Sequence, residues 1–228
     1  MQSTYKSERF NMTQAGKDIH LIPKDGIYSN LLIWLHGFGS GPEEYVQILD
    51  GSGEFDIVPQ KTKIILLSAP IIPITKFGGR TVSSWYNIIT DNEIDFNDII
   101  KNSQKIMKII KNEGKKIGFE HIIVGGFSQG ASMSYYLGYN LPFQLGGIIV
   151  CSGKLFDEVE ILKENHNLKV FIGYGDEDNI IYSSEVEKNI ERINNKDCLD
   201  VHLYKNIGHQ INHDEMVDIG KFMKKIFC

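Results

Sequence analysis

The sequence predicts an α/β fold in which a mostly parallel sheet carries helices on both faces. Short, continuous runs of β-branched and other apolar residues recur along the chain, bounded by Gly, Pro or charged residues. Strands that are buried on both faces typically have this pattern. Helical patterns lie between several of these runs, and such alternation indicates parallel strands covered on both sides. With 228 residues, 42% of them hydrophobic, the chain fits a single domain, residues 1–228, with a sizeable core.

The predicted strands differ between the N-terminal segment and the rest of the chain. Residues 5–14 and 20–26 are expected to form an extra antiparallel hairpin at one edge of the sheet. The buried-strand pattern then recurs at residues 31–35, 63–67, 121–124, 147–150, 169–173 and 201–204.

The helix predicted for residues 97–113 has the clearest amphipathic pattern. Ile99, Ile106 and Ile110 fall on one face, and lysines fall on the other. Gly114 follows, and a glycine at this place typically ends a helix. Further helices are predicted at residues 131–137, 184–193 and 213–226.

The composition argues against several other classes of protein. A net charge of −5, without a cluster of Lys and Arg among aromatic residues, disfavours nucleic-acid binding. The cysteines, Cys151, Cys198 and Cys228, are far apart and odd in number, as in reduced intracellular proteins. The apolar run at residues 64–74 is broken by prolines and too short to span a bilayer, and the first residues lack a signal-peptide pattern. We therefore expect a cytoplasmic protein without a stable membrane anchor; the oligomeric state and the roles of the cysteines stay open.

The stretch Gly126–Gly130, GFSQG, places a serine at a predicted strand-to-helix turn. It matches G-x-S-x-G, a short pattern that carries little weight by itself. The apolar strand before it and the helix after it supply the setting in which a serine Oγ stands at the carboxyl edge of a sheet. A glycine-rich turn that binds phosphate is the alternative, but no P-loop lysine follows and G-x-G-x-x-G is absent. We therefore interpret Ser128 as a nucleophile.

A serine hydroxyl needs a general base at neutral pH, and His209 is the best-placed candidate. It follows the strand predicted at residues 201–204, whereas most other histidines lie in polar stretches, within a strand or at the opposite edge. His213, four residues further on, leaves a metal pair as an alternative. That pattern lacks the Glu of H-E-x-x-H and an evident third ligand, so neither a metal site nor a cofactor is expected.

An acid must hold the base in the correct tautomer, and the loop after residues 169–173 offers Asp176, Glu177 and Asp178. All three could be solvated loop charges. We select Asp178 as the acid, with Asp176 as the fallback and more readily a residue that shapes the turn. The resulting order of nucleophile, acid and base along the chain is that of α/β hydrolases.

A glycine-rich stretch, Leu35–Gly41 (LHGFGSG), follows the first buried strand and can turn backbone N–H groups inward. The N–H groups of Phe38 and Gln129 are the expected oxyanion hole for the charge that develops on a substrate carbonyl. Gln129 would then act through its backbone, so a Gln129→Ala variant is expected to keep much of the activity. His36 is expected to tie the loop down by hydrogen bonds.

Together these motifs resemble the acyl-protein thioesterase, lysophospholipase and carboxylesterase group of α/β hydrolases. The resemblance spans about residues 30–210 and rests on LHGFG (35–39), APIIPITKFGGRTVSSWYNI (69–88), VGGFSQGASMS (124–134), GYGDEDNII (173–181) and GH (208–209). It implies the α/β-hydrolase fold and a serine hydrolase, independent of metals, that cleaves acyl thioesters or esters through an acyl-enzyme. The implied substrate is an acylated protein, a lysophospholipid or a small ester. A non-catalytic acyl- or lipid-binding protein on the same scaffold is the alternative.

In this group, the segment at residues 69–88 borders an acyl channel. The resemblance therefore implies that apolar side chains of this segment bind the substrate, namely Ile71, Ile72, Ile74, Phe77 and Trp85. The alternative is that Ile71, Ile72 and Trp85 are ordinary core residues, with Trp85 packing beneath the site.

The chain departs from the usual pattern of the group in three places. An acidic residue commonly follows the L-H-G-x-G stretch, where this chain has Ser40-Gly-Pro-Glu-Glu44; Asn87 replaces a usual Asp, and Asn179 a common Pro. None of these changes removes a candidate catalytic group, so they bear on loop shape and substrate preference rather than on the chemistry.

Overall fold

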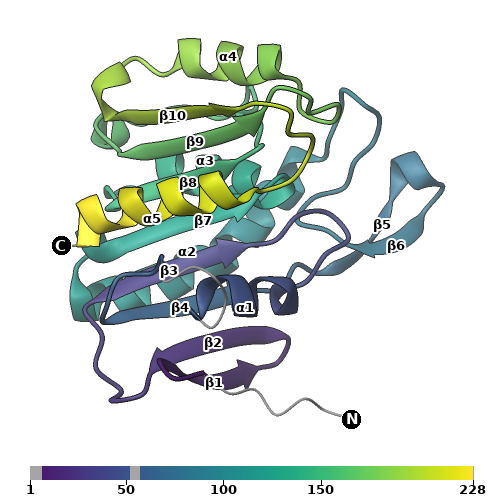
Figure 1. Ribbon diagram of the computed structural model, residues 1–228. Coiled ribbons are helices and arrows are strands. Elements are labelled where there is room, and N and C mark those ends of the chain that lie inside the picture. Colours follow the sequence, from purple (N-terminus) through teal and green to yellow (C-terminus); the bar gives the residue numbers. More distant parts are fainter. Residues whose placement is uncertain (1–6, 52–56, 228) are drawn as a thin grey trace.

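The computed structural model of the protein describes residues 7–51 and 57–227. Its centre is an eight-stranded sheet, whose strands in spatial order are β1 (Phe10–Ala15), β2 (Asp18–Pro23), β4 (Thr62–Leu67), β3 (Asn30–Leu35), β7 (Ile122–Phe127), β8 (Gly147–Cys151), β9 (Val170–Gly175) and β10 (Leu199–Tyr204) (Figure 1). β1 pairs with β2 and β2 with β4 in antiparallel fashion, and the other neighbouring pairs run parallel. The predicted α/β fold is therefore confirmed, and so is the N-terminal antiparallel hairpin at one edge.

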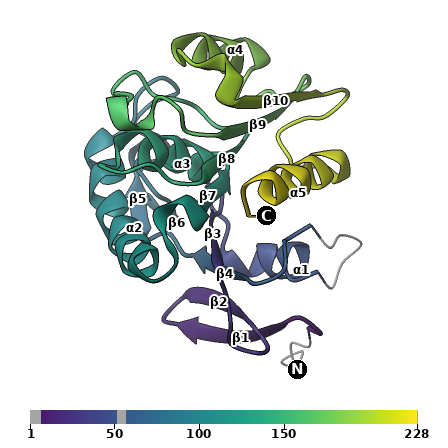
Figure 2. The same cartoon turned by 90° about the vertical axis from the view of Figure 1, so that its left-hand side faces the viewer.

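Helices cover both faces of the sheet, as predicted (Figure 2). They are α1 (Val46–Leu49), α2 (Phe96–Ile117), α3 (Gln129–Asn140), α4 (Ser183–Arg192) and α5 (His213–Phe227). One buried apolar cluster joins α2, α3 and α4 to the sheet, and a second joins α1 and α5 to the opposite face. Successive residues of β3 belong to opposite clusters: Ile33 and Leu35 lie in the first, and Leu32 and Trp34 lie in the second. Burial on both faces explains why the apolar runs are continuous.

The predicted helix end at Gly114 is wrong. α2 continues through Gly114 to Ile117 and is followed by Gly118, whose φ is 91°. Gly114 instead allows close packing, because a Cβ at this position would lie 2.3 Å from the ring of Phe119.

Residues 69–88 contain a small second sheet. β5 (Ile71–Ile74) and β6 (Arg80–Ser83) pair antiparallel as a hairpin that projects beyond the main sheet, near the carboxyl ends of β3 and β4 (Figure 1). Sequence analysis did not identify these strands. Within β5 the side chain of Ile74 alone is fully buried, so the segment lacks the burial pattern that marks the central strands.

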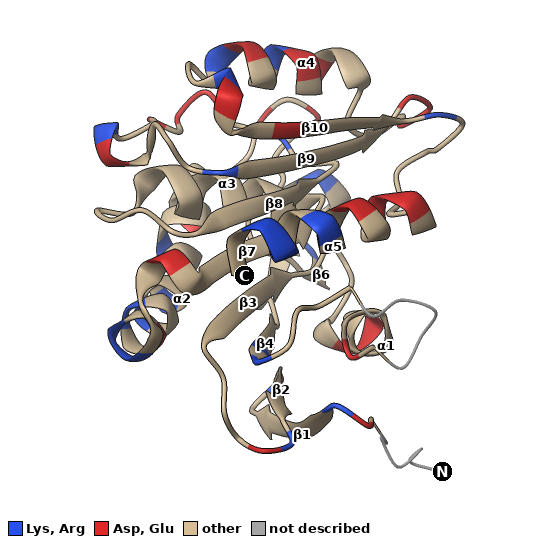
Figure 3. Cartoon of the chain, turned by 60° about the vertical axis from the view of Figure 1, so that its left-hand side comes forward, with Lys and Arg blue, Asp and Glu red and all other residues tan. Residues whose placement is uncertain are grey.

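Acidic and basic residues are interspersed along the helices and loops (Figure 3). α5 carries Asp214 in its first turn and Lys224 and Lys225 in its last turn, where each sign of charge interacts favourably with the helix dipole. Among the helices in residues 7–51 and 57–227, none is both long enough and apolar enough to span a bilayer.

Candidate active site

Ser128 lies at the junction between β7 and α3, where the chain turns sharply. Its backbone has φ 55° and ψ −117°, an uncommon conformation for a residue with a side chain, and its N–H donates to the carbonyl of Cys151 over 2.9 Å. A Cβ at Gly126 would lie 2.5 Å from the carbonyl oxygen of Leu35, and a Cβ at Gly130 would lie 2.0 Å from it. The packing of strand against helix therefore requires glycine on either side of the serine.

Asp178 and His209 lie on two neighbouring loops, which follow β9 and β10. The loops are joined by Asp176, whose Oδ1 accepts the N–H of Asn206 over 2.7 Å. Asp176 thus shapes the turn, as expected. The approach of the loops is close enough that a Cβ at Gly175 would lie 2.0 Å from a carbonyl oxygen of the second loop. These contacts hold the carboxylate of one loop against the imidazole of the other.

The structure brings Ser128, His209 and Asp178 into one hydrogen-bonded row. His209 Nε2 lies 2.9 Å from Ser128 Oγ, and His209 Nδ1 lies 2.7 Å from Asp178 Oδ2. The other carboxylate oxygen of Asp178 accepts hydrogen bonds of 2.9 Å from the N–H groups of Ile180 and Ile181. With Nδ1–H donated to the carboxylate, Nε2 is the acceptor for the serine proton. The arrangement can therefore remove a proton from the hydroxyl as it attacks a carbonyl carbon.

The acid of this row is buried, and the base can be reached from solvent. The Asp178 side chain has 0% of its surface exposed, compared with 18% for His209. Burial opposes ionisation of Asp178, but hydrogen bonds from His209 and from two backbone N–H groups outweigh it and hold the pKa of the carboxyl below its usual value. An ionised carboxylate here stabilises the imidazolium that forms when the base takes a proton.

The loop that contains Phe38 is held in place by His36. The Nδ1–H of His36 donates to the carbonyl of Gly37 over 2.7 Å, and Nε2 accepts the N–H of Ala69 over 3.0 Å. Burial lowers the pKa of the His36 imidazole, which suits this neutral tautomer. These bonds are the ones expected of a residue that ties the loop down. Phe38 is half-buried, and its ring centroid lies 5.8 Å from that of Phe77 on the β5–β6 hairpin.

The Gln129 side chain has partners that sequence analysis missed. Gln129 is 4% exposed; its Oε1 accepts from the N–H of Trp85 over 3.0 Å, and its Nε2 donates to the carbonyl of Tyr86 over 3.1 Å. The hydroxyl of Ser84 lies between the two, 2.7 Å from the Tyr86 carbonyl oxygen and 3.0 Å from Oε1. An action through the backbone alone does not account for these contacts. The sequence held one signal, because a polar amide at the start of a buried helix needs hydrogen-bond partners. The oxyanion roles of the Phe38 and Gln129 N–H groups stay predictions.

The five apolar residues assigned to substrate binding do not share one environment. Ile74 and Trp85 are 0% and 2% exposed, whereas Ile71 and Phe77 are 54% and 47% exposed. Ile72 is half-buried. Trp85 packs beneath the loop of Phe38, to which its indole N–H donates a hydrogen bond of 2.8 Å. The core alternative thus describes Trp85 and not Ile71, and the substrate contacts of all five stay predictions.

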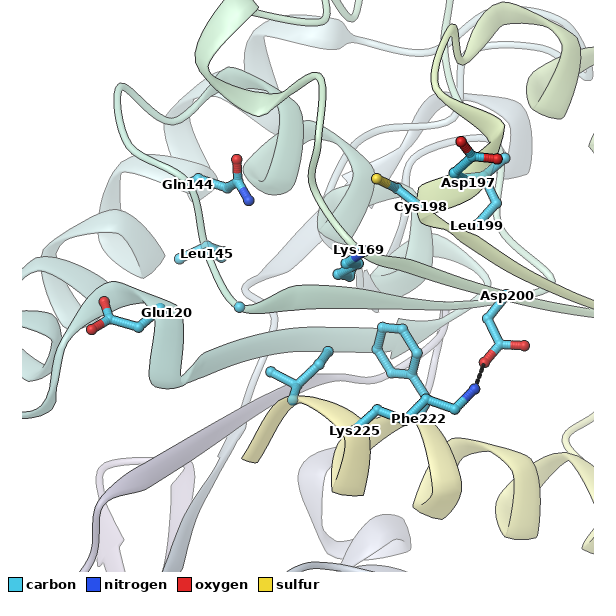
Figure 4. A pocket seen from close by; sticks show the side chains of 12 residues that line it. Glu120, Gln144, Leu145, Lys169, Asp197, Cys198, Leu199, Asp200, Phe222 and Lys225 are labelled. Carbon is cyan, nitrogen blue, oxygen red and sulfur yellow. Dashed lines mark hydrogen bonds and ion pairs between the residues drawn. The ribbon is translucent and has the colours of Figure 1, made fainter. Parts of the chain in front are cut away.

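A cavity of about 560 Å³ lies at the opposite edge of the sheet, where the parallel strands begin (Figure 4). It lies between the starts of β8, β9 and β10 and the last turns of α5, and it includes Lys169, Cys198, Phe222 and the ion pair of Lys225 with Asp200. The hydrogen-bonded row does not border this cavity. The row of Ser128, His209 and Asp178 lies at the carboxyl edge of the sheet, where open α/β sheets bind their ligands.

Metal ligation was the alternative role for the histidines after β10. The second histidine of the HQINH stretch, His213, lies 3.3 Å from Asp214. Within residues 7–51 and 57–227, no group of three or more His, Cys, Asp and Glu side chains is arranged to hold a metal ion. Cys151 and Cys198 are buried free thiols, and Cys228 lies outside the described residues.

Comparison with known sequences matches the chain to one protein family and to relatives with the same name. The sequence model of a family described as Phospholipase/Carboxylesterase matches residues 18–227. Acyl-protein thioesterase 1 of Kluyveromyces lactis is 30% identical over 213 residues, which cover 86% of this chain and 91% of the relative. Acyl-protein thioesterase 1 of Saccharomyces cerevisiae is 29% identical over 217 residues, which cover 85% of this chain and 91% of the relative.

Solved structures share the fold. The structure of acyl-protein thioesterase 2 from Zea mays matches with a TM-score of 0.80 at 20% identity, covering 94% of this chain and 100% of that one. The carboxylesterase of Bacillus cereus matches with a TM-score of 0.74 at 18% identity, covering 95% of each chain. At these identities the likeness shows the fold, which is that of the α/β hydrolases.

Proposed function

This chain belongs to the phospholipase/carboxylesterase family and is an ester or thioester hydrolase, and we propose that it works through a covalent acyl-enzyme on Ser128. The observation that carries the proposal is the geometry around His209. Its Nε2 lies 2.9 Å from the hydroxyl of Ser128, and its Nδ1 lies 2.7 Å from the carboxylate of Asp178. A base in this position can activate the hydroxyl, and the buried acid can stabilise the charged base.

In the first half of the reaction, Ser128 Oγ attacks the carbonyl carbon while His209 Nε2 takes the hydroxyl proton. The N–H groups of Phe38 and Gln129 stabilise the carbonyl oxygen as it becomes negative. When the tetrahedral intermediate collapses, His209 gives the proton to the leaving thiol or alcohol, and the acyl group stays on Ser128. Water, deprotonated by His209, then attacks the acyl-enzyme, and release of the carboxylic acid restores the serine. Asp178 orients the imidazole throughout.

The substrate that we propose is an acylated protein with a thioester-linked fatty acid. The similarity to relatives named acyl-protein thioesterase 1 supports this choice. Ile71 and Phe77 add exposed apolar surface on the β5–β6 hairpin, and Phe77 meets Phe38 next to the proposed oxyanion hole. Each CH₂ of an acyl chain buried there would contribute about 0.8 kcal/mol. A cytoplasmic location fits such a substrate and is part of the proposal.

Hydrolysis of p-nitrophenyl esters and of a palmitoylated peptide by the wild type and by Ser128→Ala tests the proposal. Ser128→Ala should lower kcat by roughly 10⁴-fold or more, because the nucleophile is lost. Ser134→Ala is the matched control in the same helix: the Ser134 hydroxyl donates to the carbonyl of Gly130 over 2.9 Å, within α3, and turnover should persist. Equal rates for the wild type and Ser128→Ala would overturn the proposal.

The choice of substrate needs a comparison of kcat/KM on a palmitoylated peptide, a lysophospholipid and a short ester. A higher value on the lysophospholipid or the short ester would reassign the substrate but leave the mechanism in place. A fluorophosphonate probe separates the enzyme from an acyl-binding scaffold without turnover, because only an activated Ser128 in folded protein is labelled.

A further inference from the structure

We infer that the Gln129 carboxamide has a positioning role: it clamps the segment 83–86 and so fixes the separation of the two oxyanion donors. The inference rests on the proposed function, because it concerns the oxyanion hole of that reaction. It also changes the expectation for Gln129→Ala, since the side chain now has a role besides that of the backbone N–H.

The two donors come from distant parts of the chain. Phe38 follows β3, and Gln129 begins α3. Both N–H groups have to lie about 2.7–3.1 Å from one oxygen to stabilise its charge. Their separation therefore has to be fixed, and the segment 83–86 forms hydrogen bonds with both sides.

On the side of Phe38, this segment holds the loop both before and after the donor, at His36 and at Gly39. The carbonyl of Ser83 accepts the N–H of Gly39 over 2.8 Å. The indole N–H of Trp85 donates to the carbonyl of His36 over 2.8 Å, and the two rings lie tilted with centroids 5.4 Å apart. The loop thus cannot shift without breaking contacts to the segment.

On the side of Gln129, the carboxamide makes the connection. Its Oε1 accepts the N–H of Trp85, a group that can only donate, and its Nε2 donates to the carbonyl of Tyr86, a group that can only accept. Backbone groups therefore fix the orientation of the amide. Ser84, 0% exposed, places its hydroxyl 2.7 Å from the carbonyl oxygen of Tyr86 and 3.0 Å from Oε1. Neither a carboxylate nor an apolar side chain can reproduce both backbone bonds.

Because these hydrogen bonds are buried, losing them should displace the segment 83–86. Trp85 and Gln129 are 2% and 4% exposed, so water cannot easily replace a lost partner. Without the amide, the N–H of Trp85 would be buried and unpaired, and the carbonyl of Tyr86 would keep only the hydroxyl of Ser84, 2.7 Å away. The segment would then move to find a partner for the Trp85 N–H. A displacement of about 1 Å at a catalytic group can cost roughly 10²-fold in rate.

The test is a Gln129→Met variant, which keeps the length of the side chain and removes its hydrogen bonds. We expect kcat to fall by about 10- to 100-fold with KM nearly unchanged, because the oxyanion is charged only in the transition state. Asn165→Ala is the matched control. Asn165 is also a buried amide, 0% exposed, and it donates to the carbonyls of Tyr139 and Leu141 at the far end of α3. Its loss should lower stability but leave kcat unchanged.

A second measurement separates positioning from general destabilisation. A boronic acid inhibitor accepts Ser128 Oγ at boron and forms a tetrahedral anion, with an oxygen in the place of the substrate oxyanion. Its inhibition constant should rise in Gln129→Met by the factor by which kcat/KM falls. Trp85→Phe, which removes the indole N–H at the other end of the clamp, should show the same pattern.

A folded Gln129→Met enzyme with the kcat and inhibition constant of the wild type overturns the inference. If that variant does not fold, Trp85→Phe decides by the same measurements. Failure of the proposed function would give a different result, because turnover would then be the same in the wild type and in Ser128→Ala. Turnover that depends on Ser128 and is unchanged in Gln129→Met would overturn this inference alone.

Discussion

The two carboxylate oxygens of Asp178 have different partners, which makes this residue sensitive to an isosteric change. Oδ1 accepts from the N–H groups of Ile180 and Ile181, whereas Oδ2 faces Nδ1 of His209. In an Asp178→Asn variant, the amide oxygen would stay with the two backbone donors, and the amide nitrogen would face His209. The imidazole would then accept at Nδ1 and carry its proton on Nε2, which has to receive the proton of Ser128.

We predict that Asp178→Asn lowers kcat by roughly 10⁴-fold with little change in fold, because the base is held in the wrong tautomer. Steady-state kinetics on an ester substrate measures the effect, and circular dichroism checks the fold. Asp176→Asn is the matched control, since Asp176 accepts from Asn206 and pairs with Lys205 outside the hydrogen-bonded row. Its kcat should stay within about threefold of the wild type, because exposed ion pairs contribute little. An equal loss in both variants would contradict the assignment of the acid.

At the scale of elements, the site depends on the close packing of α3 against the end of β3. A Cβ at Gly130 would lie 2.0 Å from the carbonyl oxygen of Leu35. Gly138 lies later in the same helix, and a Cβ there would lie 2.7 Å from the Cγ2 methyl of Ile148 and 2.8 Å from the Cδ2 methyl of Leu168. Side-chain methyl groups can shift at lower cost, whereas the carbonyl of a buried central strand cannot move without disturbing the sheet.

We predict that Gly130→Ala lowers the free energy of unfolding by about 3 kcal/mol and also lowers kcat, because the turn that holds Ser128 has to shift. Gly138→Ala should cost about 1 kcal/mol or less, since the higher helix propensity of alanine offsets part of the crowding. Urea unfolding of both variants measures the difference. Similar losses in the two would show that contact with a strand carbonyl does not govern the packing.

The existence of the central strands and main helices could be predicted because burial on both faces leaves a continuous apolar pattern. The residue at which α2 ends could not be predicted in this way. Gly114 admits the ring of Phe119, and a local pattern does not distinguish this role from that of a glycine that ends a helix. The β5–β6 hairpin was missed for a similar reason, since residues such as Ile71 are apolar but exposed.

At the scale of the whole molecule, the candidate site is assembled at the carboxyl ends of parallel strands. Ser128, Asp178 and His209 follow β7, β9 and β10, and these strands end at the same edge. Their convergence could therefore be expected from the sequence alone. The partners of the Gln129 side chain could not, because they depend on how residues 83–86 pack against a turn that is distant in sequence.

A buried acid in α5 links pH to the stability of the whole fold. Glu215 is 2% exposed, and burial raises the pKa of its carboxyl to about 7. Its Oε1 has no hydrogen-bond partner among the described residues. Of its neighbours, burial raises the pKa of the Cys151 thiol and of the Tyr204 hydroxyl, and a hydrogen bond from Lys221 outweighs burial and lowers the pKa of Asp218. Near neutral pH, Glu215 is thus the member of this group that titrates.

We predict that Glu215→Gln gains stability relative to the wild type as the pH rises from about 5 to about 8. The carboxyl titrates near 4.5 in the unfolded chain and near 7 in the folded protein, so the folded state binds the extra proton between these values. The free energy of unfolding of the wild type therefore falls across this window, by about 3 kcal/mol, since one pKa unit corresponds to about 1.4 kcal/mol. Gln stays neutral and lacks this dependence. Urea unfolding of both proteins at several pH values measures the gap, and a gap that does not change with pH would contradict a raised pKa at Glu215.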